Sequence, residues 1–149
     1  MTKSLAIIWL LFSVVFSTTS FHASALNAEN SIAVVVHSDS AVQSLSKAEV
    51  IDLFMGRFTE TSDGEVLIPL DYKSELNLKG EFYQTLVNRS LRQVNSYWSR
   101  LLFSGRAKAP VQVNSVANLG ELFNGNQHYI AYVPMNAVSE EMKIVLVLE

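Results

Sequence analysis

The chain has no cysteine among its 149 residues. This absence excludes disulfides, thiolate metal sites, a cysteine nucleophile and the lipid-modified cysteine of bacterial lipoproteins. Neither an internal repeat, a low-complexity tract nor a linker occurs along the sequence. The chain therefore has the length and the organisation of one domain with one core.

Basic residues are also scarce and scattered. There are 11 Lys and Arg against 14 Asp and Glu, which gives a net charge of −3. Only Arg106 and Lys108 lie close together. A nucleic-acid partner would require clustered Lys and Arg, so this function class is excluded. Anion binding is still compatible with an acidic total, because neutral backbone N–H groups at helix starts bind anions.

The N-terminus has the pattern of a secretory signal peptide. Lys3 is the only charged residue before the apolar run 5–16, and Ala23-Ser24-Ala25 follows as a cleavage motif. We predict cleavage after Ala25, a signal peptide of residues 1–25 and a mature domain of residues 26–149. An uncleaved anchor is the alternative, although the run is shorter than the roughly 20 residues that cross a bilayer.

Export and the lack of cysteine together indicate a compartment. Small secreted eukaryotic domains commonly depend on disulfides to offset a limited core. A cysteine-free exported chain of this size therefore fits a bacterial periplasmic protein, with a mature form that is not embedded in the membrane. Without Lys3, ten basic residues face fourteen acidic ones, so the net charge of the mature chain is −4.

Strand and helix patterns alternate along the mature chain. Apolar runs predict strands at 31–36, 65–70, 129–133 and 143–148, and helical spacing predicts helices at 46–55, 78–87, 90–103 and from residue 115. Ser46 with Glu49 and Ser90 with Gln93 form capping boxes at two of the helix starts. The aromatic residues Phe82, Tyr83, Tyr97, Trp98 and Phe103 are expected in the core. The pattern predicts an α/β domain with a short mixed sheet flanked by helices.

No catalytic or metal-binding motif appears. His37 and His128 lack the spacing of metal ligands, and no Ser/His/Asp order, G-x-S-x-G turn or P-loop is present. We therefore predict a protein that is not an enzyme and that carries no metal or cofactor.

Four segments occur in an order that is informative. They are LSKAEVIDLFMG at 45–56, DG at 63–64 with PLD at 69–71, YW at 97–98 with FSG at 103–105, and YIAYV at 129–133. This order resembles the small single-lobe relatives of the phosphate-binding periplasmic proteins, over nearly the whole mature chain. The resemblance implies one lobe of a type 2 periplasmic binding protein. It also implies binding of phosphate or a similar oxyanion for an inner-membrane ABC permease or an envelope sensor.

The chain departs from that family in its loop at 70–76. The two-lobed phosphate-binding proteins carry an Arg-x-Asp-x-Ser-Gly-Thr loop, whereas this chain keeps Asp71 and Ser74 but has Glu75-Leu76 in place of Gly-Thr. Lys79 stands where the small relatives often have an arginine. These departures favour an alternative, a non-catalytic periplasmic scaffold or accessory protein that acts through protein contacts.

An oxyanion site would require several preorganised donors. The candidates are Ser38, Asp39, Ser40, Asp71, Ser74, Lys79, Arg106 and Ser115. The serines would donate hydroxyls, Lys79 or Arg106 would supply a cation, and Asp39 or Asp71 would accept the proton of hydrogen phosphate. A serine at a helix start also serves as a structural N-cap, the interpretation favoured for Ser46 and Ser90.

The placement of these serines is a direct test. Ligands gather at the strand-to-helix loops along one edge of an α/β sheet. Ser38, Ser74 and Ser115 should therefore converge on one concave point if they form a site, and the binding interpretation fails if they scatter.

Overall fold

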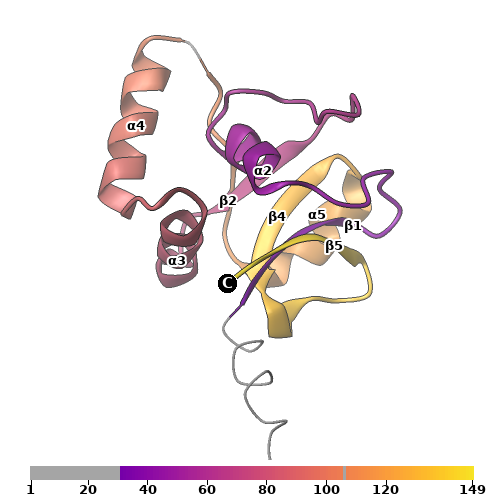
Figure 1. Cartoon of the computed structure of the whole chain (residues 1–149). Coiled ribbons are helices and arrows are strands. Elements are labelled where there is room, and N and C mark those ends of the chain that lie inside the picture. Colours follow the sequence, from indigo (N-terminus) through magenta and orange to yellow (C-terminus); the bar gives the residue numbers. More distant parts are fainter. Residues whose placement is uncertain (1–30, 106) are drawn as a thin grey trace, which may run out of the picture.

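The computed structural model describes residues 31–105 and 107–149. In these residues four α-helices flank one five-stranded mixed sheet, which confirms the predicted α/β class (Figure 1). The predicted signal peptide, the start of the mature chain and Arg106 lie outside the described residues.

The strands and helices are, in chain order, β1 (Ile32–His37), α2 (Lys47–Phe54), β2 (Ile68–Tyr72), α3 (Leu76–Val87), α4 (Leu91–Phe103), β3 (Val111–Val113), the 3-10 turn η1 (Val116–Asn118), α5 (Leu119–Gly125), β4 (Tyr129–Pro134), the 3-10 turn η2 (Met135–Ala137) and β5 (Met142–Leu148). Strands and helices alternate along the chain except that α4 follows α3 directly.

The strand order is β3-β2-β4-β1-β5, with two strand directions. β2 is parallel to both β3 and β4, whereas β1 is antiparallel to both β4 and β5. Val36 of β1 and Pro69 of β2 both pair with Ile130 of β4. The end of β1 and the beginning of β2 therefore flank the same part of β4, at the opposite edge of the sheet from the end of β2.

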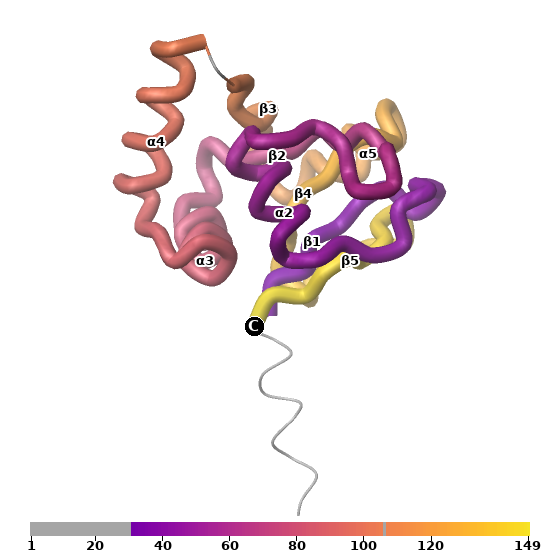
Figure 2. The backbone as a smooth tube through the Cα atoms, turned by 45° about the horizontal axis from the view of Figure 1, so that its top comes forward, coloured from indigo at the N-terminus to yellow at the C-terminus, as the bar shows by residue number. Residues whose placement is uncertain are grey.

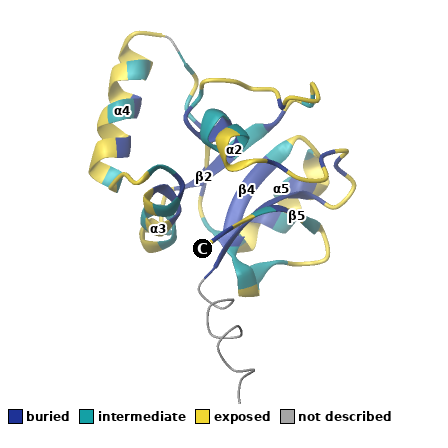
Figure 3. Cartoon of the chain, viewed as in Figure 1, coloured by how far each residue is buried: buried dark blue, intermediate teal, exposed yellow. Residues whose placement is uncertain are grey.

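The core lies on both faces of the central strands. All six residues of β1 are buried, as a strand covered on both faces requires (Figure 3). Tyr132 of β4 stacks on Phe82 of α3 and contacts Phe54 of α2, so these two helices cover one face. α5 contributes buried Leu119 and Phe123 to the same core and packs on β1 (Figure 2).

Several details differ from the sequence prediction. β2 begins at Ile68 and ends at Tyr72, so Pro69 is its second residue. β3 was not predicted, because three residues are too short for a periodic pattern. Phe103 is not a core residue but is 96 % exposed, because the last turn of α4 extends beyond the parts it packs against (Figure 1).

Both predicted capping boxes are present. Ser46 accepts a hydrogen bond from the backbone N–H of Glu49 while Glu49 accepts from that of Ser46, and Ser90 and Gln93 repeat the arrangement. Glu49 also accepts hydrogen bonds from the N–H and the hydroxyl of Ser62, at 3.2 and 2.7 Å. These bonds, with those from Ser46, lower the pKa of Glu49 to about 2. One carboxylate thus caps α2 and fixes the loop that leads to β2.

Replacing this carboxylate should change how stability depends on pH. The pKa of Glu49 is lower in the folded chain than its ordinary 4.5, so its stabilisation is complete above about pH 5 and declines as the pH falls toward 2. We expect Glu49→Gln to lower the free energy of unfolding by about 1 kcal/mol at pH 7. Urea titrations should show that this difference narrows between pH 5 and pH 2. A difference that is constant over that range would contradict the assignment.

Gly56 ends the segment after α2 at a point of close approach. Its φ is +66°, and a Cβ built on it would lie 2.7 Å from the Trp98 ring of α4. The hydroxyl of Tyr97 also donates to the carbonyl of Met55, at 2.7 Å. The missing side chain of Gly56 thus allows α4 to pack beside the end of α2.

Gly64 provides a matched control for this contact. Its φ is +85°, but nothing lies within 4 Å of a Cβ built there. Gly64→Ala should therefore cost about 1 kcal/mol through its backbone alone, and Gly56→Ala should cost roughly 1–3 kcal/mol more because the new methyl meets an aromatic ring. Thermal or urea unfolding measures both. Equal losses for the two variants would show that the Trp98 contact is not tight.

Candidate functional site

The carboxyl ends of β2, β3 and β4 lie at one edge of the sheet, because these three strands are parallel. Lys73 and Ser74 follow β2, and Asn114 and Ser115 follow β3. The N–H of Lys73 donates to the carbonyl of Val113, at 2.9 Å, so the two loops leave the sheet side by side. Two of the predicted serines, Ser74 and Ser115, therefore do share an edge.

Ser38, Asp39 and Ser40 lie at the other edge. They follow β1, which runs antiparallel to β4 and so ends where β2 begins. The predicted convergence of Ser38 with Ser74 and Ser115 is wrong. The physical reason is the reversed direction of β1, which moves the loop after it to the far end of the sheet.

The residues after β1 have structural partners there. The N–H of Ser38 donates to the carbonyl of Glu141, and the hydroxyl of Ser40 accepts from the N–H of Val42. Lys143 of β5 donates to the carbonyl of Ser40. The backbone of Asp39 donates to Nδ1 of His37 at 3.0 Å. The contacts with Glu141 and Lys143 hold the loop against the beginning of β5, and the other two fix its own conformation.

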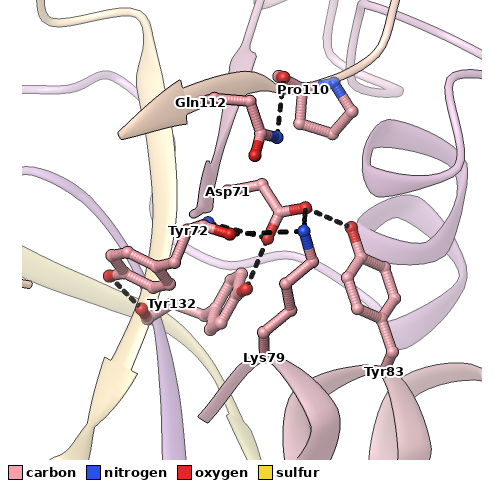
Figure 4. A network of polar contacts seen from close by, with 7 residues as sticks. All are labelled: Asp71, Tyr72, Lys79, Tyr83, Pro110, Gln112 and Tyr132. Carbon is pink, nitrogen blue, oxygen red and sulfur yellow. Dashed lines mark hydrogen bonds and ion pairs between the residues drawn. The ribbon is translucent and has the colours of Figure 1, made fainter. Parts of the chain in front are cut away.

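Asp71 is the centre of a buried polar network between β2, β4 and α3 (Figure 4). Its Oδ1 accepts hydrogen bonds from the hydroxyl of Tyr132 at 2.6 Å and from the N–H of Tyr72 at 2.9 Å. Its Oδ2 lies 2.8 Å from Nζ of Lys79 and accepts from the hydroxyl of Tyr83 at 3.2 Å. Asp71 is 2 % exposed. Every acceptor of its carboxylate thus has a partner inside the protein.

The tyrosines of this network are donors with firmly held protons. Burial, with the nearby charge of Asp71, raises the pKa of both Tyr83 and Tyr132 well above the ordinary value. Burial also raises the pKa of Tyr72, whose hydroxyl donates to the carbonyl of Tyr132 at 2.7 Å. Asp71 and Lys79, both predicted as ligand-binding residues, are paired with each other. Asp71 also accepts from the hydroxyls of Tyr83 and Tyr132, and Lys79 also donates to the carbonyl of Tyr72, at 3.3 Å.

Removing the cation from this network should destabilise the fold. Lys79→Met leaves the Asp71 carboxylate buried without its charged partner, and breaking a buried pair in this way costs about 3 kcal/mol. Lys73→Met is the matched control, since Lys73 is exposed and an exposed lysine contributes within about 0.5 kcal/mol. Urea unfolding of the two variants decides the matter. A loss for Lys79→Met no larger than that for Lys73→Met would contradict a buried ion pair.

A shallow polar cavity of about 320 Å³ opens beside the two loops that share the carboxyl edge. Its lining residues are Lys73, Gln112, Val113, Asn114, Asn118, Glu121 and Leu122. The hydroxyl of Ser115 donates to Oδ1 of Asn118 at 3.0 Å and so orients one of the lining amides. We name this cavity the carboxyl-edge pocket. It combines one cation, one carboxylate and three amide side chains.

The beginning of α3 adds donors near this pocket. Its N-cap residue is Glu75, which makes no side-chain hydrogen bond to the helix. Ser74 is exposed, and its hydroxyl has no partner among the described residues. Uncapped N–H groups at a helix start carry a partial positive charge and bind anions. The N–H of Leu76 donates to the carbonyl of Ser74, at 2.9 Å, so the donors that remain beside Lys73 are the hydroxyl of Ser74 and the next N–H groups of the first turn of α3.

None of the lining residues of the carboxyl-edge pocket was predicted from the sequence. Lys73, Asn114, Asn118 and Glu121 follow strand ends or lie in the short helical segments after β3. The signal that could have identified them is the polar Asn114-Ser115 directly after VQV, the place where a parallel strand ends. That signal was hidden because the strand itself is three residues long.

Among residues 31–105 and 107–149, no group of three His, Cys, Asp or Glu side chains is arranged to hold a metal ion. None of the helices in the same ranges is both long and apolar enough to cross a membrane.

Comparisons with known proteins give likeness in structure but not in sequence. No protein-family model matches the chain, and no curated protein sequence matches it significantly. The structure is similar to the crystal structure of an ABC-type phosphate transport receptor from Vibrio cholerae, with a TM-score of 0.59 and 15 % identity. The fold is that of part of this receptor.

A second solved structure gives the same result. It is that of a protein named as a phosphate ABC transporter substrate-binding protein, with bound phosphate, from Clostridium perfringens, with a TM-score of 0.58 and 15 % identity. Both alignments cover 76 % of this chain but only 44 % and 43 % of the respective neighbours. The chain thus corresponds to less than half of each of these proteins.

Proposed function

We propose that the chain is a non-catalytic periplasmic binding protein for a small oxyanion, with phosphate as the first candidate ligand. The observation that carries the proposal is the carboxyl-edge pocket, in which Lys73 and three amide side chains surround about 320 Å³ in a fold shared with phosphate transport receptors. Residues 1–25 would direct export, and residues 26–149 would form the binding domain. The bound anion would be passed to an inner-membrane ABC permease or presented to an envelope sensor.

Four lining residues of the pocket have distinct roles in this proposal, and Ser74 and the start of α3, which follow Lys73 in the sequence, add to them. Lys73 would supply the point charge, and the amides of Asn114 and Asn118 would donate to the remaining oxygens. Ser74 and the uncapped start of α3 would add hydroxyl and backbone donors. Glu121 would accept the proton of hydrogen phosphate, a role predicted from the sequence for Asp39 or Asp71. Fully ionised sulfate has no such proton, so the carboxylate would repel it.

Calorimetric titration of the exported protein with phosphate, after removal of bound anion, tests the proposal. We expect saturable binding of phosphate and none of sulfate. Lys73→Gln should weaken phosphate binding about tenfold, the effect of losing one charge-assisted hydrogen bond, and Ser74→Ala should weaken it less. Lys108→Gln removes an exposed lysine away from the pocket and should leave the affinity unchanged.

The discrimination against sulfate provides an independent check. Glu121→Gln removes the carboxylate and should allow sulfate to bind, while phosphate binding falls. No heat with phosphate up to millimolar concentration would overturn the proposal. Binding that is indifferent to Lys73→Gln would place the anion somewhere other than at the carboxyl edge.

A second candidate function, a scaffold that acts through protein contacts, is favoured by a different surface. A groove of about 540 Å³ runs between the segments that precede β2 and β3. Its lining includes Phe58, Val66 and Val111, which are 63 %, 43 % and 45 % exposed, together with Pro69 and Pro110. Contiguous exposed apolar surface of this kind marks an interaction site more often than an isolated apolar residue does.

A further inference from the structure

A separate pocket of about 440 Å³ lies between α2, the end of α3 and α4. Its lining residues are Lys47, Ile51, Met55, Arg57, Thr85, Leu86, Val87, Asn88, Arg89 and Tyr97. It shares no residue with the carboxyl-edge pocket. We name it the basic pocket, because three cations and no acidic residue are among its lining residues.

The concentration of positive charge is unusual for this chain. Apart from Lys3 and Arg106 the chain has nine basic residues, and three of them line this one pocket although the protein as a whole is acidic. Asp52 lies next to the pocket and is paired with Arg57, at 3.0 Å. The guanidinium of Arg89 has no hydrogen-bond or ion-pair partner among the described residues. The guanidinium of Arg89 is therefore free to bind an anionic ligand.

The fold holds a second cation in a fixed position. Nζ of Lys47, in the first turn of α2, donates to the carbonyl of Thr85 in the last turn of α3, at 2.8 Å. α3 has no basic residue of its own in that turn, so Lys47 compensates the partial negative charge of the helix end. An ammonium group has three N–H donors, and this bond uses one of them. The other two can meet a ligand.

The floor of the pocket is apolar. Met55 and Leu86 are buried, and Ile51, Val87 and Tyr97 are partly buried beside them. The hydroxyl of Tyr97 is occupied by its hydrogen bond to the carbonyl of Met55. The polar end of Tyr97 is therefore turned to the backbone, and its contribution to a ligand would be apolar contact. A bare inorganic anion would leave this floor unused, and a neutral apolar ligand would leave the cations unused.

We propose that the basic pocket binds an anionic amphiphile, with a phosphate or carboxylate headgroup between Lys47, Arg57 and Arg89 and a short apolar portion on the floor. Two sources share this chemistry. One is a free organic phosphate or acid, and the other is the headgroup region of an anionic membrane lipid. This ligand is distinct from the oxyanion of the carboxyl-edge pocket, so the two proposals stand or fall separately.

Titration of the exported protein with octyl phosphate tests the proposal. We expect saturable binding that is at least about tenfold weaker for Arg89→Gln, since a hydrogen bond to a charged group is lost. Arg100→Gln, an equal change at an exposed position of α4, should have no effect. Lys73→Gln should leave octyl phosphate binding intact although it weakens phosphate binding. This pair of variants separates a failure of one pocket from a failure of the other.

Ligands of different chain length and charge test the floor and the cations without altering the protein. Butyl phosphate should bind more weakly than octyl phosphate, because it buries less apolar surface. Uncharged octyl glucoside should not compete. Flotation with phosphatidylglycerol vesicles, compared with phosphatidylcholine vesicles, distinguishes the sources. Arg89-dependent capture only by the anionic vesicles assigns a lipid headgroup, and octyl phosphate binding without capture assigns a free ligand.

Two results would overturn the proposal. One is the absence of binding to both octyl phosphate and anionic vesicles. The other is binding that Arg89→Gln and the charge reversal Arg89→Glu leave unchanged. Arg89 is exposed and its side chain has no partner in the described part of the chain, so neither variant should disturb the fold. Circular dichroism of both variants checks this point.

Discussion

A single buried carboxylate holds three parts of this domain together. Asp71 belongs to β2, and its partners Tyr132 and Lys79 belong to β4 and α3. A buried charge is tolerated only when it is paired and hydrogen-bonded, so these elements must reach their final positions for the network to form. The loop that leaves β2 is anchored on this network. Lys73 and Ser74, whose side chains face solvent, thus directly follow a strand that the network holds in place.

The secondary structure could be predicted because its signals are local. Ser46 with Glu49 and Ser90 with Gln93 mark two helix starts through contacts between residues three apart. Strand direction carries no such local signal. β1 has the composition of any strand buried on both faces, and only its pairing with β4 and β5 reveals that it runs against β2. Because the direction of β1 could not be predicted, Ser38 was wrongly expected to lie with Ser74 and Ser115.

The candidate site was harder to predict than the fold, for a related reason. Asp71 and Lys79 were each predicted as ligand-binding residues, but the sequence does not show that they pair with each other. Nor does it show that the hydroxyls of Tyr83 and Tyr132 donate to Asp71 in the interior. The cations Lys47 and Arg89 are far apart in sequence and come together only through helix packing. Sites formed by tertiary contacts alone leave no spacing pattern to recognise.

The position of β1 also has a consequence for how the chain folds. Val34 pairs with Tyr132 on one side and with Leu146 on the other, so the first strand finds both neighbours only in the last part of the sequence. Closing such long loops is slow, because chain entropy is lost before any contact compensates for it. The sheet cannot close around β1 while the ribosome is still making β5. In the nascent chain β1 therefore stays without either partner until β4 has been synthesised, and its pairing is complete only after β5 has followed.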